Sequence, residues 1–166
     1  MKMSNTLLAE KYALGATEGT GSNMFIEDDT IYSYGNHYKI AVRLNPSQKF
    51  ATGISHVYNP DRYSSTTNKH QAYVRQNLQS YIAIPDCNTD ESFLRSYLNK
   101  LKLEVEEVKT KQSKLKTKGK RFYQFESKIE SMTERVKEVE HFTVALYGGQ
   151  AIHFIKSVDE EEAIAS

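Results

Sequence analysis

Two heptad repeats of apolar residues fill the second half of this chain and limit its fold more than any other feature. The first repeat consists of Leu94, Leu98, Leu101, Val105, Val108, Gln112 and Leu115. The second consists of Phe122, Phe125, Ile129, Met132, Val136 and Val139. Alternating spacings of three and four place these side chains on one face of an α-helix, where they can pack against a second helix. The sequence therefore predicts two long amphipathic helices within residues 88–141.

The segment between the repeats predicts a tight connection. It reads Lys116-Thr117-Lys118-Gly119-Lys120, and glycine favours the end of a helix. Two long helices with a short connection form an antiparallel hairpin, whose longer arm of about 27 residues would extend about 40 Å. We call the two contact faces formed by these repeats the seam. Its one polar residue, Gln112, is a candidate for fixing the register of the two helices.

Residues 24–87 are predicted to form a small unit that carries strands and one helix. Strands are expected near residues 24–26, 30–34, 38–44 and 50–58, because apolar runs are separated there by breaks such as 27–29 and turn signals such as Gly35-Asn36. A helix over residues 66–79 would follow the capping run 64–68, and a short strand is expected over residues 81–84. The predicted fold class is α+β: a small antiparallel sheet with one packed helix, plus a long antiparallel helical (coiled-coil) hairpin.

The two ends of the chain carry weaker signals. Residues 1–23 are interpreted as a flexible or partly helical N-terminal arm, with a helix at 5–13 and a glycine-rich connector after it. Residues 142–157 are expected to form a C-terminal strand or hairpin around Gly148-Gly149; the alternative is that the second long helix continues to Tyr147. Residues 158–166 form an acidic tail that is expected to be mobile.

Composition narrows the classes of function. The net charge of +1 gives no overall field that would attract nucleic acid or a membrane surface. No apolar run approaches the roughly 18–20 residues of a spanning helix, and no secretory signal is evident at the start.

The single cysteine, Cys87, excludes an internal disulfide and is expected to be a buried thiol without a chemical role. The single cysteine also fits a cytosolic protein, so we expect a cytoplasmic location. The five histidines lack the close spacing of metal ligands, so we expect no metal and no cofactor.

Two short motifs are dense in tyrosine, hydroxyl side chains and histidine. The first spans residues 31–38 and the second residues 63–71. The second lies at the predicted start of a helix, where free N–H groups can hold a phosphate or carboxylate. If His37 packs opposite His70, the two imidazoles would form an acid–base pair suited to phosphodiester chemistry. The alternative, which the sequence favours, is that these residues cap the helix and fill a polar part of the core.

Both motifs resemble an uncharacterised domain family that is common in phage, prophage and plasmid reading frames. Residues 29–41 match its pattern Asp-Thr-Ile-Tyr-Ser-Tyr-Gly-x-His-Phe-Pro-Ile-Ala, except for Tyr38-Lys39 in place of Phe-Pro. Residues 63–70 match its pattern Tyr-Ser-Val-Thr-Thr-x-Lys-His, except at Ser65. The resemblance covers about residues 22–80, outside the hairpin, and implies a phage accessory role. The candidate binding site that it implies consists of Tyr32, Ser33, Tyr34, Gly35, His37, Tyr63, Ser64, Thr66, Thr67 and His70.

A basic segment covers the predicted hairpin tip. It carries seven cations in 13 residues with no acid among them: Lys109, Lys111, Lys114, Lys116, Lys118, Lys120 and Arg121. Clustered cations can neutralise phosphates, and Phe122 and Tyr123 directly after them are candidates for stacking on bases. The alternatives are a solvated tip, which the sequence favours, and contact with an acidic protein surface. The second helix is acidic, so charge-steered formation of a homodimer is a further hypothesis.

These features favour a phage-type accessory protein that acts by macromolecular binding. The leading hypothesis is host takeover or anti-defence through contact with a host or phage protein, because the overall charge is nearly neutral. The first alternative is a small DNA- or RNA-binding protein that uses the basic hairpin tip. The second is a small enzyme with a site at His37 and His70.

Overall fold

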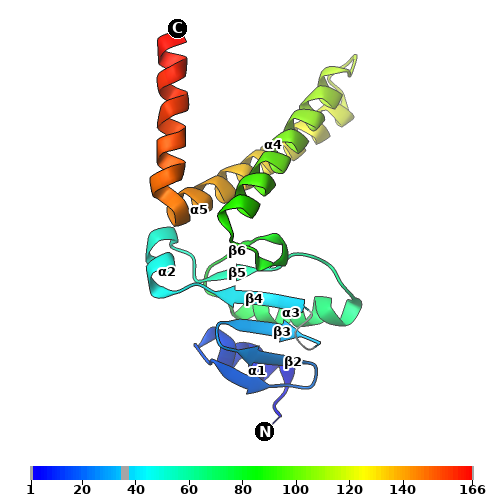
Figure 1. Ribbon diagram of the computed structural model, residues 1–166. Coiled ribbons are helices and arrows are strands. Elements are labelled where there is room, and N and C mark those ends of the chain that lie inside the picture. The colour runs from blue at the N-terminus through cyan, green and yellow to red at the C-terminus, as the bar shows by residue number, and fades with distance from the viewer. Residues whose placement is uncertain (1, 35–37, 166) are drawn as a thin grey trace. The chain divides into compact units, whose positions relative to one another are not determined.

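The structure is a computed structural model that describes residues 2–34 and 38–165, with side-chain surroundings as far as Gly148 (Figure 1). It divides into two compact units, Met1–Thr89 and Asp90–Ser166, which are described separately. The fold class is α+β, as the sequence predicted.

A six-stranded sheet with the strand order β1-β2-β3-β4-β5-β6 forms the centre of the first unit. Its strands are β1 (Glu18–Thr20), β2 (Met24–Glu27), β3 (Thr30–Ser33), β4 (Tyr38–Arg43), β5 (His56–Tyr58) and β6 (Tyr81–Ala83). Neighbours from β1 to β5 pair antiparallel, whereas β5 and β6 pair parallel. The prediction of a purely antiparallel sheet is therefore wrong at its last strand. A helix connects β5 to β6 and returns the chain to the same end of the sheet, which a parallel pair requires.

Two helices cover one face of this sheet, and both begin with a serine cap. They are α1 (Asn5–Ala13) and α3 (Ser65–Asn77), and they pack against each other. The predicted helices at 5–13 and 66–79 are thus confirmed within two residues. Leu8 of α1, Val74 of α3 and Ile31 of the sheet are completely buried in the resulting core.

The predicted flexible connector is wrong, because its residues form strand β1 beside β2. Gly19 of β1 lies so close to α1 that a Cβ at this position would come within 2.7 Å of Leu8 Cδ1. The glycine there permits close approach of a helix to a strand, whereas the sequence analysis took the local composition as a sign of flexibility.

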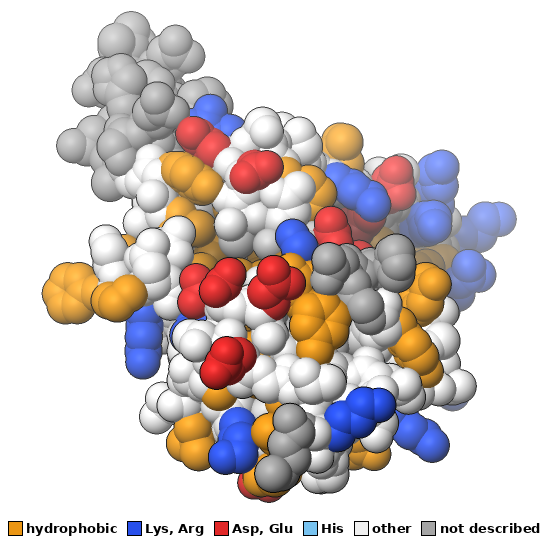
Figure 2. Space-filling model, turned by 60° about the horizontal axis from the view of Figure 1, so that its bottom comes forward, with side chains coloured by type: hydrophobic (Ala, Val, Ile, Leu, Met, Phe, Trp, Pro, Cys, Tyr) orange, Lys and Arg blue, Asp and Glu red, His pale blue; other side chains and the backbone are white. Residues whose placement is uncertain are grey.

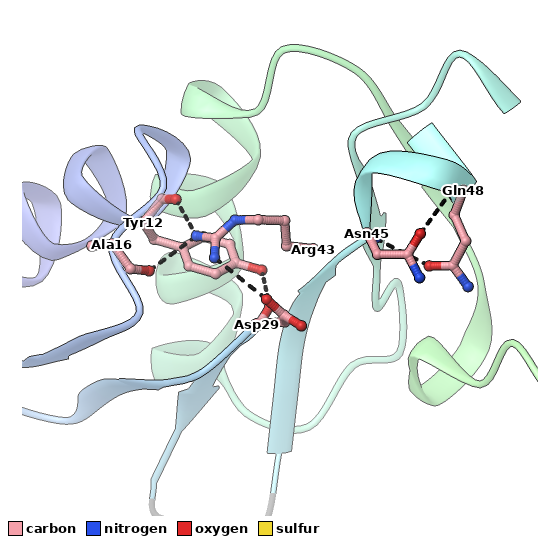
Figure 3. Close-up of polar contacts among 6 residues, drawn as sticks. All are labelled: Tyr12, Ala16, Asp29, Arg43, Asn45 and Gln48. Atoms are coloured by element: carbon pink, nitrogen blue, oxygen red, sulfur yellow. Dashed lines mark hydrogen bonds and ion pairs between the residues drawn. The ribbon is translucent and has the colours of Figure 1, made fainter. Parts of the chain in front are cut away.

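The predicted strand at residues 50–58 is wrong over its first half. Helix α2 (Pro46–Thr52) occupies that region, and only β5 remains as strand. The Asn45 side chain accepts a hydrogen bond from the Gln48 N–H at 2.8 Å, and the Gln48 side chain accepts one from the Asn45 N–H at 3.1 Å (Figure 3). This capping box starts the helix, and Gly53, with φ of +72°, ends it.

The second unit confirms the predicted antiparallel helical hairpin. Helix α4 (Glu91–Ser113) packs along helix α5 (Lys120–Ala165). Every residue of both heptad seams is buried or half-buried, in agreement with the predicted contact faces. Near the tip, Gln112 Nε2 of α4 donates a hydrogen bond to the Phe122 carbonyl of α5 at 3.2 Å. The polar seam residue therefore ties the two arms together at one register.

The predicted C-terminal strand or hairpin over 142–157 is wrong, and the alternative of a continued helix is right. Helix α5 extends to Ala165 with non-helical backbone angles only at Tyr147, directly before Gly148. Phe142 and Thr143 are both buried, so the apolar face of the helix continues past the last heptad position. The region expected to be a mobile acidic tail also has helical backbone up to Ala165.

Candidate functional site

The two tyrosine-rich motifs meet in a buried polar network between β3 and α3. Ser33 Oγ lies 2.7 Å from His70 Nδ1 and 3.5 Å from Thr67 Oγ1. Ser64 Oγ caps α3 by accepting the Thr67 N–H at 3.1 Å, and its hydroxyl donates to Thr67 Oγ1 at 3.0 Å. The structure therefore brings Ser33 of the first motif within hydrogen-bonding distance of Thr67 and His70 of the second, and Ser64 joins the network through Thr67.

A chain of hydrogen bonds determines which nitrogen of His70 carries the proton. Asn5 Oδ1 accepts the Ser22 N–H at 3.0 Å, which leaves the amide nitrogen of Asn5 to donate to His70 Nε2 at 3.3 Å. His70 Nε2 is therefore an acceptor, so the proton resides on Nδ1 and is donated to Ser33 Oγ. Burial lowers the pKa of His70 from its ordinary value, so the neutral ring is favoured.

The centre of this network is closed to solvent, whereas Asn5 and Ser64 at its ends are half-buried. Ser33 and Thr67 are completely buried and His70 is 2% exposed. Both ring nitrogens of His70 have protein partners, as buried polar groups require. These observations support the structural interpretation of both motifs, in which Ser33, Ser64, Thr67 and His70 hold α3 against the sheet.

The other candidate residues of the two motifs are more exposed to solvent. Tyr34 and Tyr63 are 39% and 68% exposed, and the Tyr34 ring lies 5.7 Å from the His70 ring. Tyr32 is half-buried and stacks on Phe25 with ring centroids 4.8 Å apart. Thr66 is half-buried in the first turn of α3. Gly35 and His37 lie outside the described residues, so the hypothesis of a His37–His70 pair stays a prediction.

A second buried network lies beside the first, and the sequence analysis missed it. Gln71 Nε2 lies 2.7 Å from Tyr38 Oη and 2.8 and 2.9 Å from the carbonyl oxygens of Asn59 and Asp61, so its two N–H groups are shared among three acceptors. Tyr38 Oη in turn donates to the Asp61 carbonyl, and burial raises the Tyr38 pKa. Asn59 is 1% exposed and donates to the Lys39 carbonyl at 2.9 Å. The sequence does indicate a turn at Asn59-Pro60-Asp61, but it does not show which distant side chains bind the carbonyl groups of that turn.

A third cluster joins the end of α1 to the sheet around Arg43 (Figure 3). Its guanidinium donates to the carbonyls of Tyr12 and Ala16 at 2.7 and 3.0 Å and lies 3.7 Å from the Asp29 carboxylate. The Tyr12 hydroxyl donates to the Asp29 carbonyl at 2.8 Å. These bonds satisfy carbonyl groups at the helix end, so the cluster stabilises the fold.

His56 packs against this cluster, with its ring 5.3 Å from the Tyr12 ring. Ser55 Oγ lies 2.7 Å from His56 Nδ1 and donates its own proton to the Ser80 carbonyl. His56 Nδ1 therefore carries the ring proton, while Nε2 is buried without a hydrogen-bond partner among the described residues. Burial, together with the charges of Arg43 and Lys49, lowers the His56 pKa to about 4.

The hairpin tip is exposed and positively charged, in contrast to the buried polar clusters of the first unit. All seven cations of the basic segment are exposed there, where α4 ends and α5 begins. Lys109 lies 3.4 Å from Glu106, and among the described residues no carboxylate lies within 4 Å of the other six. Lys118 and Arg121 lie over the rings of Phe122 and Phe125 at 5.4 and 5.6 Å. We use the name basic tip for Lys109, Lys111, Lys114, Lys116, Lys118, Lys120 and Arg121.

The comparisons with known proteins leave the family open. No family model matches the chain, and neither a curated protein nor a solved structure matches it.

Within residues 2–34 and 38–148, no three His, Cys, Asp or Glu side chains stand close enough to hold a metal ion. No helix in the described part of the chain is long and apolar enough to cross a membrane.

Proposed function

We propose that this protein binds nucleic acid through the basic tip of its helical hairpin. The observation that carries the proposal is that seven cations are exposed, six of them without a carboxylate within 4 Å among the described residues. Exposed, unpaired lysine and arginine side chains neutralise phosphates and release counterions, which drives association with a polyanion.

The distribution of charge supports a nucleic acid over an acidic protein. Figure 2 shows acidic and basic side chains both exposed on the face in view, so this face does not carry charge of a single sign. Within the hairpin, residues 90–108 and 122–148 carry ten carboxylates against six cations, whereas the 13 residues of the tip carry seven cations and no acid. The chain as a whole is therefore nearly neutral, but its hairpin tip is strongly positive. The evenly spaced phosphates of a nucleic-acid backbone complement this charge.

The direct test is a titration of fluorescently labelled single-stranded DNA, duplex DNA and RNA, followed by anisotropy at 50 and 200 mM salt. If six or seven phosphates are contacted, the affinity falls about a thousandfold over this range. Reversing three charges with Lys116→Glu, Lys118→Glu and Lys120→Glu is expected to abolish binding at 200 mM salt. The matched control carries Lys11→Glu, Lys49→Glu and Lys69→Glu, at exposed positions of the first unit. It changes the net charge by the same amount as the tip variant but leaves the basic tip intact, so it is expected to bind nucleic acid. Undiminished binding by the tip variant would overturn the proposal, as would no binding by the wild-type chain at 50 mM salt.

A second candidate is contact with a host or phage protein in a phage accessory role, such as host takeover or anti-defence. One observation favours it: Leu103 on α4 is 66% exposed and lines a shallow depression with Glu106, Glu107 and Lys111. Exposed apolar side chains rimmed by charges are typical of protein contact surfaces. A partner captured by the wild-type chain but not by Leu103→Glu, with unchanged circular dichroism, would support this function.

A further inference from the structure

The three aromatic rings at the hairpin tip differ in their surroundings. Phe122 and Phe125 are half-buried members of the seam, and each has a cation over its ring. Tyr123 is 56% exposed and meets the Phe122 ring edge-on, with centroids 5.5 Å apart and planes at 85°. Among the described residues, no other ring and no cation lies against the Tyr123 ring. The structure thus leaves one aromatic side chain of the tip available to a ligand.

The backbone around Tyr123 keeps its surroundings open. Side chains on a helix lean toward its N-terminus, so the residues of the preceding turn, Gly119 and Lys120, decide how open the space beside Tyr123 is. The Tyr123 N–H bonds to the Gly119 carbonyl at 3.3 Å, which places Gly119 one turn before it. Gly119 has no side chain, and a Cβ built there would meet no atom within 4 Å. Lys120 lies three residues before Tyr123 and therefore shares its face of the helix.

We propose that Tyr123 is a stacking platform for one unpaired base, and that single-stranded nucleic acid is the preferred ligand of the basic tip. This inference rests on the proposed function, because the cations supply the phosphate contacts. A tyrosine ring stacks on the flat face of any base, so the interaction is tolerant of sequence. In a duplex these faces are already stacked on neighbouring bases, and opening a step costs a few kcal/mol. Cations flanking an exposed ring therefore favour a single strand.

The test uses the full chain and a labelled 20-nucleotide single strand beside a duplex of the same sequence. For Tyr123→Ala we expect affinity for the single strand to fall about 5- to 150-fold, with the duplex affected less than twofold. The dependence of affinity on salt should be unchanged, because no charge is removed. The matched control, Tyr123→Phe, keeps the ring and is expected to bind within about twofold of wild type.

A second variant gives a direct signal. The chain contains no tryptophan, so Tyr123→Trp introduces a single indole whose emission reports on this position alone. We expect the single strand to quench this emission and the duplex to leave it largely unchanged. If Tyr123→Ala binds the single strand as tightly as wild type, or the emission is constant while anisotropy reports binding, the inference is overturned and the proposed function stands. If the wild-type chain binds neither nucleic acid, both are overturned.

Discussion

Replacing Ser33 with alanine tests whether the buried network stabilises the first unit. The substitution removes the oxygen that accepts the proton of His70 Nδ1 at 2.7 Å, at a position completely closed to solvent. A buried donor without an acceptor destabilises a protein by about 1–3 kcal/mol. The longer Ser33–Thr67 contact, at 3.5 Å, adds little. We therefore expect Ser33→Ala to lower the free energy of unfolding by about 2 kcal/mol.

The assay needs a signal that belongs to the first unit alone. Cys87 provides one, because it is the only cysteine, is 6% exposed, and burial raises the pKa of its thiol. Its reaction with a thiol reagent in increasing urea therefore reports opening of this unit, while circular dichroism reports both units. The exposed Ser65→Ala is the control and should change stability by less than about 0.5 kcal/mol.

A double-mutant cycle separates this hydrogen bond from a general effect of the substitutions. Removing both partners with Ser33→Ala and His70→Leu leaves no unpaired group at this bond, so the double variant should lose less stability than the two single variants together. We expect a coupling of about 0.5–3 kcal/mol. Strict additivity, or a Ser33→Ala variant as stable as wild type, would refute the structural interpretation of the two motifs.

Two further predictions concern pH and the hairpin seam. The His56 pKa is about 4 in the folded chain, below the ordinary value, so the unfolded chain takes up this proton first as the pH falls. Stability from this group is complete above about pH 6.5 and is lost toward pH 4; we expect a loss of about 2 kcal/mol by pH 5. His56→Leu should remove that part of the loss in urea titrations at pH 7.5 and 5, and an unchanged pH dependence would contradict the argument. In the seam, Val105 is 6% exposed, so Val105→Ala should destabilise the hairpin by about 1.5 kcal/mol in thermal unfolding followed by circular dichroism. The same measurement on Leu103→Ala, at a 66% exposed position, should show almost no change, and equal effects would contradict the assigned faces.

Local patterns in the sequence were sufficient to predict the hairpin and its contact faces. Every seam position from Leu94 to Val139 is buried or half-buried, because a heptad repeat encodes its own periodicity and each helix needs only its sequence neighbour as a partner. The Ser64 cap of α3 was predictable for the same reason, since the donor and acceptor lie three residues apart. The basic tip was also visible in the sequence, because its charges are contiguous.

Tertiary structure decided the features that depend on contacts between distant residues. Residues between α1 and β2 form strand β1 by pairing with β2, and Gly19 permits the close approach of α1. Residues 142–157 are part of helix α5, whose residues Phe142 and Thr143 are buried. The bonds of His70 to Asn5 and Ser33 span 65 and 37 residues of chain. A sequence pattern shows that such side chains are present, but only folding brings them within hydrogen-bonding distance and excludes the water that would otherwise pair with them.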